Sequence, residues 1–224
     1  MGRGNTERKQ TQWATIPRLW DGELAACIAC GPSLDPQDIE AIEGRAKTIV
    51  INDAYRIAGW ADLLYACDAP WWDRFAQDHL WEVDGKQWAG ALNFKGHRVT
   101  QDAGAAYRWG LIHVEGKKGE GISLDPTYIH TGNNSGLQAL NLAALLGARR
   151  IVLLGYDMGR TGGRAHWFGD HPAGLQKRTP FDRCIPAFEE AAPMLAVAGV
   201  EVVNASRETA LTCFPRQPIK EALR

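Results

Sequence analysis

The sequence predicts a single-domain α/β protein with a Rossmann-like, mostly parallel sheet that carries helices on both faces. Short apolar runs alternate along the chain with stretches of helical periodicity, and this alternation is typical of strand–helix connections in a parallel sheet. The apolar runs end in small or polar residues, as strands do where they enter a turn. The length of 224 residues suits one well-buried domain.

The first predicted unit begins with an apolar strand over residues 24–30 (LAACIAC). A turn at Gly31, Pro32 and Ser33 follows it, and then a short helix over residues 35–42, with Ser33 or Asp35 as its N-cap. Residues 48–51 (TIVI) predict a β-branched strand that ends at Asn52. The chain thus enters the sheet at least twice within its first quarter.

The middle of the chain gives weaker signals. Residues 63–67 (LLYAC) predict a strand that ends at Asp68, and Pro70 suits the first turn of a helix that continues to about residue 79. Residues 91–94 and 110–114 are further strand candidates. Residues 115–121 (EGKKGEG) predict a polar, glycine-rich loop.

The clearest helix covers residues 134–147, because Asn134 and Ser135 supply a polar N-cap and Gly147 follows the last apolar residue. An apolar strand over residues 151–154 comes next and ends at Gly155, Tyr156 and Asp157. A helix over residues 181–198 and a strand over residues 200–203 complete the expected fold.

The chain shows no repeat and no linker. We expect a flexible arm over residues 1–22, a nucleotide-binding α/β domain over residues 23–215 and a tail over residues 216–224. The formal net charge of −1 gives no broad field that would attract nucleic acid or an anionic membrane. The sequence does not indicate an oligomeric state.

Composition also indicates a cytoplasmic protein. No stretch approaches the ~20 apolar residues of a spanning helix, and no N-terminal segment resembles a signal peptide. The five cysteines lack the spacing of a disulfide framework, which fits a reducing compartment. Cys27 and Cys30 lie within one predicted strand, so we expect packing roles, although Cys30 at the strand end can touch a ligand.

Polar residues follow each predicted strand at the edge where open α/β sheets bind ligands. The Gly31–Ser33 turn precedes a helix, and a helix N-terminus favours an anion, while glycine lets the backbone approach a phosphate closely. Residues 131–136 (TGNNSG) form a second polar turn at a helix N-terminus. Both turns are candidates for holding a nucleotide, and both could instead be plain strand-to-helix connections.

Residues 166–171 (HWFGDH) carry two histidines and an aspartate in one predicted loop. His166 or His171 could act as a general base, since histidine titrates near neutral pH. A metal site and a structural role are the alternatives, although this spacing is not a recognised zinc pattern.

Taken together, residues 28–34 (IACGPSL), Asn52, residues 131–157 and the 166–171 loop resemble the bacterial sialyltransferases of glycosyltransferase family 42. They resemble equally the wider superfamily of phage and bacterial proteins that includes the 6-hydroxymethylpterin diphosphokinase-like group. The resemblance covers about residues 25–214 in scattered blocks. At the family's first turn Cys30 stands in place of an asparagine, and Asp68 replaces another.

This resemblance implies a metal-independent transfer from a nucleotide sugar to an acceptor hydroxyl, with no further cofactor. Its candidate catalytic residues are His171, His166 and Asp157. Its candidate donor-binding residues are Cys30, Gly31, Pro32, Ser33, Asn52, Asp68, Asn133, Asn134, Ser135, Gly136 and Tyr156. The acceptor would be a glycan or a modified nucleic acid, held near Trp71, Trp72 and the 115–121 loop.

Two other functions remain open from the sequence. A diphosphotransferase that uses ATP and Mg²⁺ needs carboxylates around the phosphates, and Asp53, Asp68, Asp157 and Asp170 could supply them. A non-catalytic module that binds a nucleotide or a partner is the other, because a fold does not fix a function.

Overall fold

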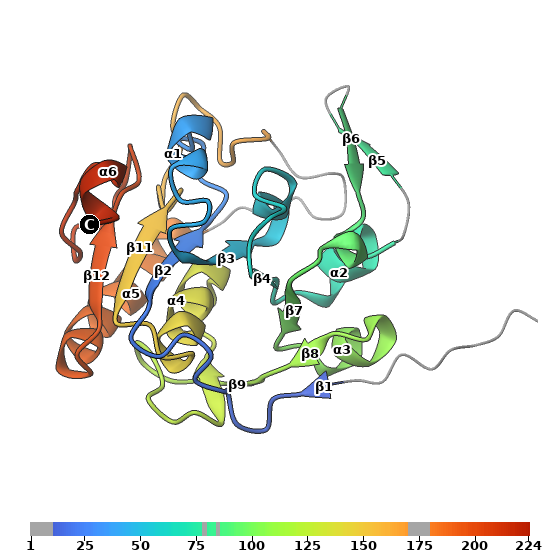
Figure 1. Cartoon of the computed structure of the whole chain (residues 1–224), viewed down its shortest axis with the longest axis horizontal. Helices are drawn as coiled ribbons and strands as arrows, with labels where there is room; N and C mark the ends of the chain where they lie inside the picture. Colours follow the sequence, from blue (N-terminus) through green and yellow to red (C-terminus); the bar gives the residue numbers. More distant parts are fainter. Residues whose placement is uncertain (1–10, 78–79, 84–85, 170–179) are drawn as a thin grey trace, which may run out of the picture.

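The structure is a computed structural model that describes residues 11–77, 80–83, 86–169 and 180–224. The strands of its central sheet are β1 (Thr11–Gln12), β2 (Leu24–Ile28), β3 (Lys47–Ile51), β4 (Leu63–Tyr65), β7 (His97–Thr100), β8 (Ile112–His113), β11 (Arg150–Leu154) and β12 (Glu201–Asn204). These eight strands lie in the order β1-β8-β7-β4-β3-β2-β11-β12 (Figure 1). Every pairing between neighbours is parallel, which confirms the predicted fold class.

Helices cover both faces of the sheet. They are α1 (Pro36–Glu40), α2 (Ala69–Phe75), α3 (Ala103–Trp109), α4 (Ser135–Leu145), α5 (Phe181–Val197) and α6 (Ile219–Ala222), with 3-10 turns η1 (Asn52–Arg56) and η2 (Ala91–Asn93). The buried residues of α4 and α5 belong to one core cluster, and those of α1, α2, α3 and α6 belong to another. A hairpin of β5 (Leu80–Val83) and β6 (Lys86–Ala89) and a small sheet of β9 (Glu115–Lys117) and β10 (Tyr128–His130) lie outside the main sheet.

Strand β2 shows why the central strands are continuously apolar. Successive side chains of a strand point to opposite faces, so Ala25 and Cys27 enter one core cluster while Ala26 and Ile28 enter the other. All four are 0% exposed. A strand that is covered on both faces therefore needs an apolar residue at every position, and this is the pattern that the sequence displays.

Most predicted elements appear, with shifted ends. Asp35 caps α1, because its side chain accepts a hydrogen bond from the Gln37 backbone N–H at 2.9 Å. Helix α2 ends at Phe75, well before residue 79. The predicted strand over residues 91–94 is wrong, since η2 closes there with i→i+3 hydrogen bonds. The predicted loop over residues 115–121 begins with strand β9, which pairs with β10.

The two flanking segments pack with the fold. From residue 11 onward the expected arm contributes β1, which pairs with β8, and buries Ile16 and Trp20. The expected tail forms α6, whose Ile219 and Leu223 are buried. Burial of these apolar side chains stabilises both segments against the core, so the packing does not follow the predicted boundaries at residues 23 and 215. Within the described ranges, no helix is long and apolar enough to cross a membrane.

Candidate functional site

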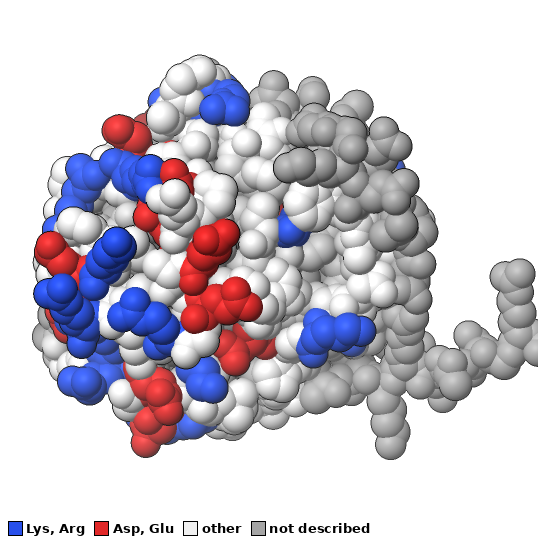
Figure 2. Space-filling view, turned by 45° about the horizontal axis from the view of Figure 1, so that its top comes forward, with Lys and Arg blue, Asp and Glu red and all other residues white. Residues whose placement is uncertain are grey.

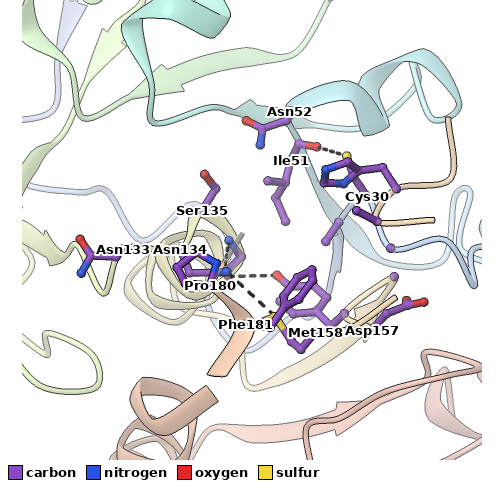
Figure 3. Close-up of a pocket in the computed structure, with 18 of the residues that line it drawn as sticks. Cys30, Ile51, Asn52, Asn133, Asn134, Ser135, Asp157, Met158, Pro180 and Phe181 are labelled. Atoms are coloured by element: carbon purple, nitrogen blue, oxygen red, sulfur yellow. Dashed lines mark hydrogen bonds between the residues drawn. The ribbon is translucent and has the colours of Figure 1, made fainter. Parts of the chain in front are cut away.

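The order of the strands creates a switch point between β2 and β11. From β2 the chain moves outward through β3 and β4, and it later returns to β11 on the other side of β2. Open α/β sheets bind ligands outside the carboxyl ends of their strands at such a point. A pocket of about 440 Å³ lies there (Figure 3).

Most of the predicted site residues line this pocket. They are Cys30, Gly31, Asn52, Asp68, Asn133, Asn134, Ser135, Gly136, Tyr156, Asp157 and His166. Pro32 and Ser33 are not among its lining residues. His171 and Asp170 lie outside the described residues, so the structure says nothing of either.

Asp157 joins the turn after β2 to the turn after β11. One of its carboxylate oxygens accepts a hydrogen bond from the Ser33 backbone N–H at 2.8 Å, and the other accepts one from Ser33 Oγ, also at 2.8 Å. Burial raises the pKa of this carboxyl, while its hydrogen bonds oppose the shift. Because both oxygens are already engaged, Asp157 is better suited to hold the turn than to transfer a proton.

Gly31 allows the two turns to meet. A Cβ at Gly31 would lie 2.0 Å from Asp157 Oδ1 and 2.4 Å from the carbonyl oxygen of Gly155. The Gly31 N–H donates to that carbonyl at 2.9 Å. The need for glycine here is therefore steric, and it comes from a neighbour more than 120 residues away in the sequence.

Three strained backbone positions converge on the pocket. Among the described residues, Asn52, Asn133 and Met158 are the non-glycine residues with positive φ, at 50°, 52° and 49°. All three line the pocket. Left-handed backbone at such residues costs on the order of 1–3 kcal/mol each and clusters at functional sites, so this coincidence independently marks the pocket.

The N-terminus of α4 forms one wall. The Asn134 side-chain oxygen accepts hydrogen bonds from the N–H groups of Gly136 and Leu137 at 2.8 and 3.1 Å, so it is used in capping. The Ser135 hydroxyl lies 3.0 Å from Cys67 Sγ and faces Asn52 across the pocket (Figure 3). Because the cap already uses these N–H groups, it is the dipole of the helix that favours an anion at this wall.

Gly136 permits Tyr156 to pack under this wall. A Cβ on Gly136 would lie 2.9 Å from Tyr156 Cε1, and the Tyr156 hydroxyl donates to the Gly136 carbonyl at 3.0 Å. Burial raises the pKa of Tyr156 well above its usual value, so its hydroxyl stays protonated and acts as a fixed donor.

The histidine-bearing loop is anchored at the opposite wall. The backbone N–H of Trp167 donates to the Cys30 carbonyl at 3.1 Å, while Cys30 Sγ donates to the Ile51 carbonyl at 3.2 Å. Burial raises the pKa of the Cys30 thiol, so Cys30 meets a ligand as a neutral group. The His166 ring stacks on Phe168, with centroids 5.1 Å apart and planes 7° apart.

A buried ion pair supports the same wall. Asp53 and Arg56 are joined at 2.5 Å, with side chains 1% and 2% exposed, and Asp53 also accepts a hydrogen bond from Trp71 Nε1 at 3.0 Å. The Arg56 guanidinium lies 5.7 Å from the centre of the Phe168 ring. Both contacts of Asp53 are therefore with buried side chains. Asp53 does not line the pocket, as it would have to do in order to hold Mg²⁺ for a diphosphotransferase.

The expected acceptor region is only partly assembled. Trp71 lines the pocket but is 4% exposed, and Trp72 is 0% exposed, so both tryptophans serve mainly in packing. No residue of the 115–121 loop lines the pocket. In the described ranges, no group of three His, Cys, Asp or Glu residues is arranged to hold a metal ion.

Sequence reasoning missed Met158, Pro180 and Phe181, which also line the pocket. Phe181 is the first residue of α5 and Pro180 is its N-cap, and the rule that helices start near the ligand-binding edge of the sheet could have identified them. Met158 follows Asp157 with no local signal of its left-handed backbone.

Comparisons with protein-family models, curated proteins and solved structures found no match. The fold and the pocket therefore define the protein only as a Rossmann-like α/β protein with a pocket at its switch point.

Proposed function

We propose that this chain is a nucleotide-dependent transferase, and specifically a metal-independent glycosyltransferase of the cytoplasm. It would use a nucleotide-sugar donor and the hydroxyl of a glycan or a modified nucleic acid. The observation that supports this proposal is the gathering of the Cys30–Gly31 turn, Asn52, Ser135 and His166 around one pocket at the carboxyl edge of the sheet. The volume of about 440 Å³ lies in the range of small-ligand sites.

In this mechanism the N-terminus of α4 receives the phosphate of the donor, because the helix dipole stabilises negative charge there and the Ser135 hydroxyl lines the same wall. His166 or His171 accepts the proton of the acceptor hydroxyl. The acceptor oxygen bonds to the sugar carbon as the bond from that carbon to the nucleotide oxygen breaks, and the nucleotide leaves with the electron pair. Its new negative charge faces the same helix N-terminus.

Turnover of a panel of CMP-, UDP- and GDP-sugars tests the proposal, with released nucleotide measured by chromatography. We expect release with one donor class in the presence of a chelator. Loss of the general base lowers rates by about 10²–10⁴-fold, so His166→Ala or His171→Ala should show that loss. His97→Ala is the matched control, because His97 is exposed and does not line the pocket.

Other outcomes would contradict the proposal. Release of AMP from ATP only when Mg²⁺ is present would indicate a diphosphotransferase. Nucleotide binding without turnover, unaffected by either histidine variant, would indicate a non-catalytic binding module.

A further inference from the structure

We propose that a second cavity, formed by α6 and the segment after β12, binds a small ligand that carries phosphate groups. This inference stands independently of the function proposed above. The cavity has a volume of about 780 Å³ and shares no lining residue with the central pocket. It is of ligand size, but its chemistry differs from that of the central pocket.

Positive charge dominates the lining of this second cavity. Its charged residues are Arg207, Arg216, Lys220, Arg224, Asp38 and Glu221. Lys and Arg side chains gather, with some acidic ones between them, on the left of Figure 2, where Figure 1 places α6 and β12. The whole chain has a formal net charge of −1, so this excess is local.

The excess remains after the existing ion pairs are considered. Arg207 contacts Asp38 and Asp35, each at 2.7 Å, so this group has one more carboxylate than cations. Arg216, Lys220 and Arg224 add three cations and Glu221 adds one carboxylate, which leaves an excess of one positive charge when Asp35 is counted with the lining. Among the described residues, none of these three cations has an ion-pair partner within 4.0 Å. A ligand could therefore contact them without displacing a carboxylate.

Arg216 is held so that part of its guanidinium stays available. Its Nη2 donates to the carbonyls of Ser206 and Arg207 at 3.3 and 2.8 Å. Both bonds use the same nitrogen, which leaves Nε and Nη1 without a hydrogen bond to the described residues. Each of these nitrogens can give a charge-assisted hydrogen bond to a separate phosphate oxygen.

Helix α6 is fixed rather than loosely attached. Arg150 Nε donates to the Ala222 carbonyl at 3.1 Å, and Arg45 Nη2 donates to the Leu223 carbonyl at 3.3 Å. Ile219 and Leu223 are buried. Lys220 therefore projects from an anchored helix, so an anion that binds it need not also order the backbone of α6.

Isothermal titration with inorganic pyrophosphate tests the proposal at low and at physiological ionic strength. We expect the native chain to bind it, with weaker binding at higher salt. Arg216→Gln/Lys220→Gln should weaken binding by about tenfold or more, since each removes a charge-assisted contact. Lys220→Glu provides a second variant, because Lys220 is exposed and its change cannot disturb the core.

Two controls locate the effect. Lys95→Gln/Lys118→Gln removes the same charge from exposed positions outside both cavities and should leave binding unchanged. Ser135→Ala alters the central pocket and should leave unchanged the part of the binding that Arg216→Gln/Lys220→Gln removes. The proposal is overturned if native protein fails to bind pyrophosphate, if the lysine control weakens binding equally, or if Ser135→Ala abolishes it. Binding of a short single-stranded oligonucleotide much tighter than that of pyrophosphate would also overturn it, in favour of a nucleic-acid surface.

Discussion

Replacing Gly31 by alanine tests how the turns at the switch point are held together. The new Cβ would lie 2.0 Å from Asp157 Oδ1 and 2.4 Å from the Gly155 carbonyl oxygen. Neither atom moves freely, since Asp157 accepts two hydrogen bonds from Ser33 at 2.8 Å and the Gly155 carbonyl accepts one from the Gly31 N–H at 2.9 Å. The substitution must therefore displace a backbone turn or a hydrogen-bonded carboxylate.

The free energy of unfolding should fall measurably. Overpacking a tight site costs roughly 1–3 kcal/mol, and loss of one hydrogen bond between Asp157 and Ser33 would add about 1.5–3 kcal/mol, because the acceptor is charged. Urea denaturation of the native and Gly31→Ala chains measures this difference.

Gly159→Ala is the matched control, because Gly159 lines the same pocket and its Cβ would meet no atom closer than Asp157 O at 3.7 Å. We expect it to stay within about 0.5 kcal/mol of the native chain. A Gly31→Ala chain as stable as the native one, or an equal loss in Gly159→Ala, would refute the steric argument.

Three further predictions follow from buried or strained groups. Asp53→Ala should lower the free energy of unfolding by about 3–5 kcal/mol, because it leaves the Arg56 charge buried and unpaired, and Asp53→Leu/Arg56→Leu should recover much of that loss; urea denaturation decides, and an additive double variant would contradict the pairing. Asn52→Gly should stay within about 1 kcal/mol of native stability, because glycine adopts a φ of 50° readily, yet it should weaken ligand binding by calorimetry; unchanged affinity would remove the Asn52 side chain from the site. Burial raises the pKa of Cys27 and of Cys67 from 9.0 to about 12, so the unfolded chain loses these protons first and stability should fall as pH rises above about 9; Cys27→Ala should flatten the slope of the urea midpoint against pH, and an unchanged slope would argue against this cause.

Local patterns were sufficient to predict much of the fold. The apolar run before Gly31 and the capped helix at Asn134 carry their signals within a few residues, because continuous burial and capping are local requirements. Strands β1, β7 and β10 are two to four residues long, and such short segments lack a readable period. Their pairing depends on neighbours that are distant in the sequence.

The residues of the candidate site also fall into two groups: those that local sequence patterns predict, and those that contacts with distant residues determine. Asn52, Ser135 and His166 could be predicted because they follow strands or precede a helix, at the edge where ligands bind. The contact of Asp157 with Ser33 spans 124 positions, so no local pattern could predict that Asp157 holds a turn. The left-handed backbone of Met158 is likewise imposed by its surroundings, since methionine has no preference for it.

A thermal-shift screen against nucleotides and nucleotide sugars, with and without Mg²⁺, tests most directly whether the pocket at the switch point is a nucleotide site. A ligand at 100 times its dissociation constant stabilises the fold by about 2.7 kcal/mol, which corresponds to a rise of roughly 5–11 °C in the unfolding midpoint for a chain of this size. We expect a metal-independent rise with one CMP- or UDP-type ligand that is reduced in Ser135→Ala. No rise with any nucleotide would contradict the nucleotide site and leave only the fold established.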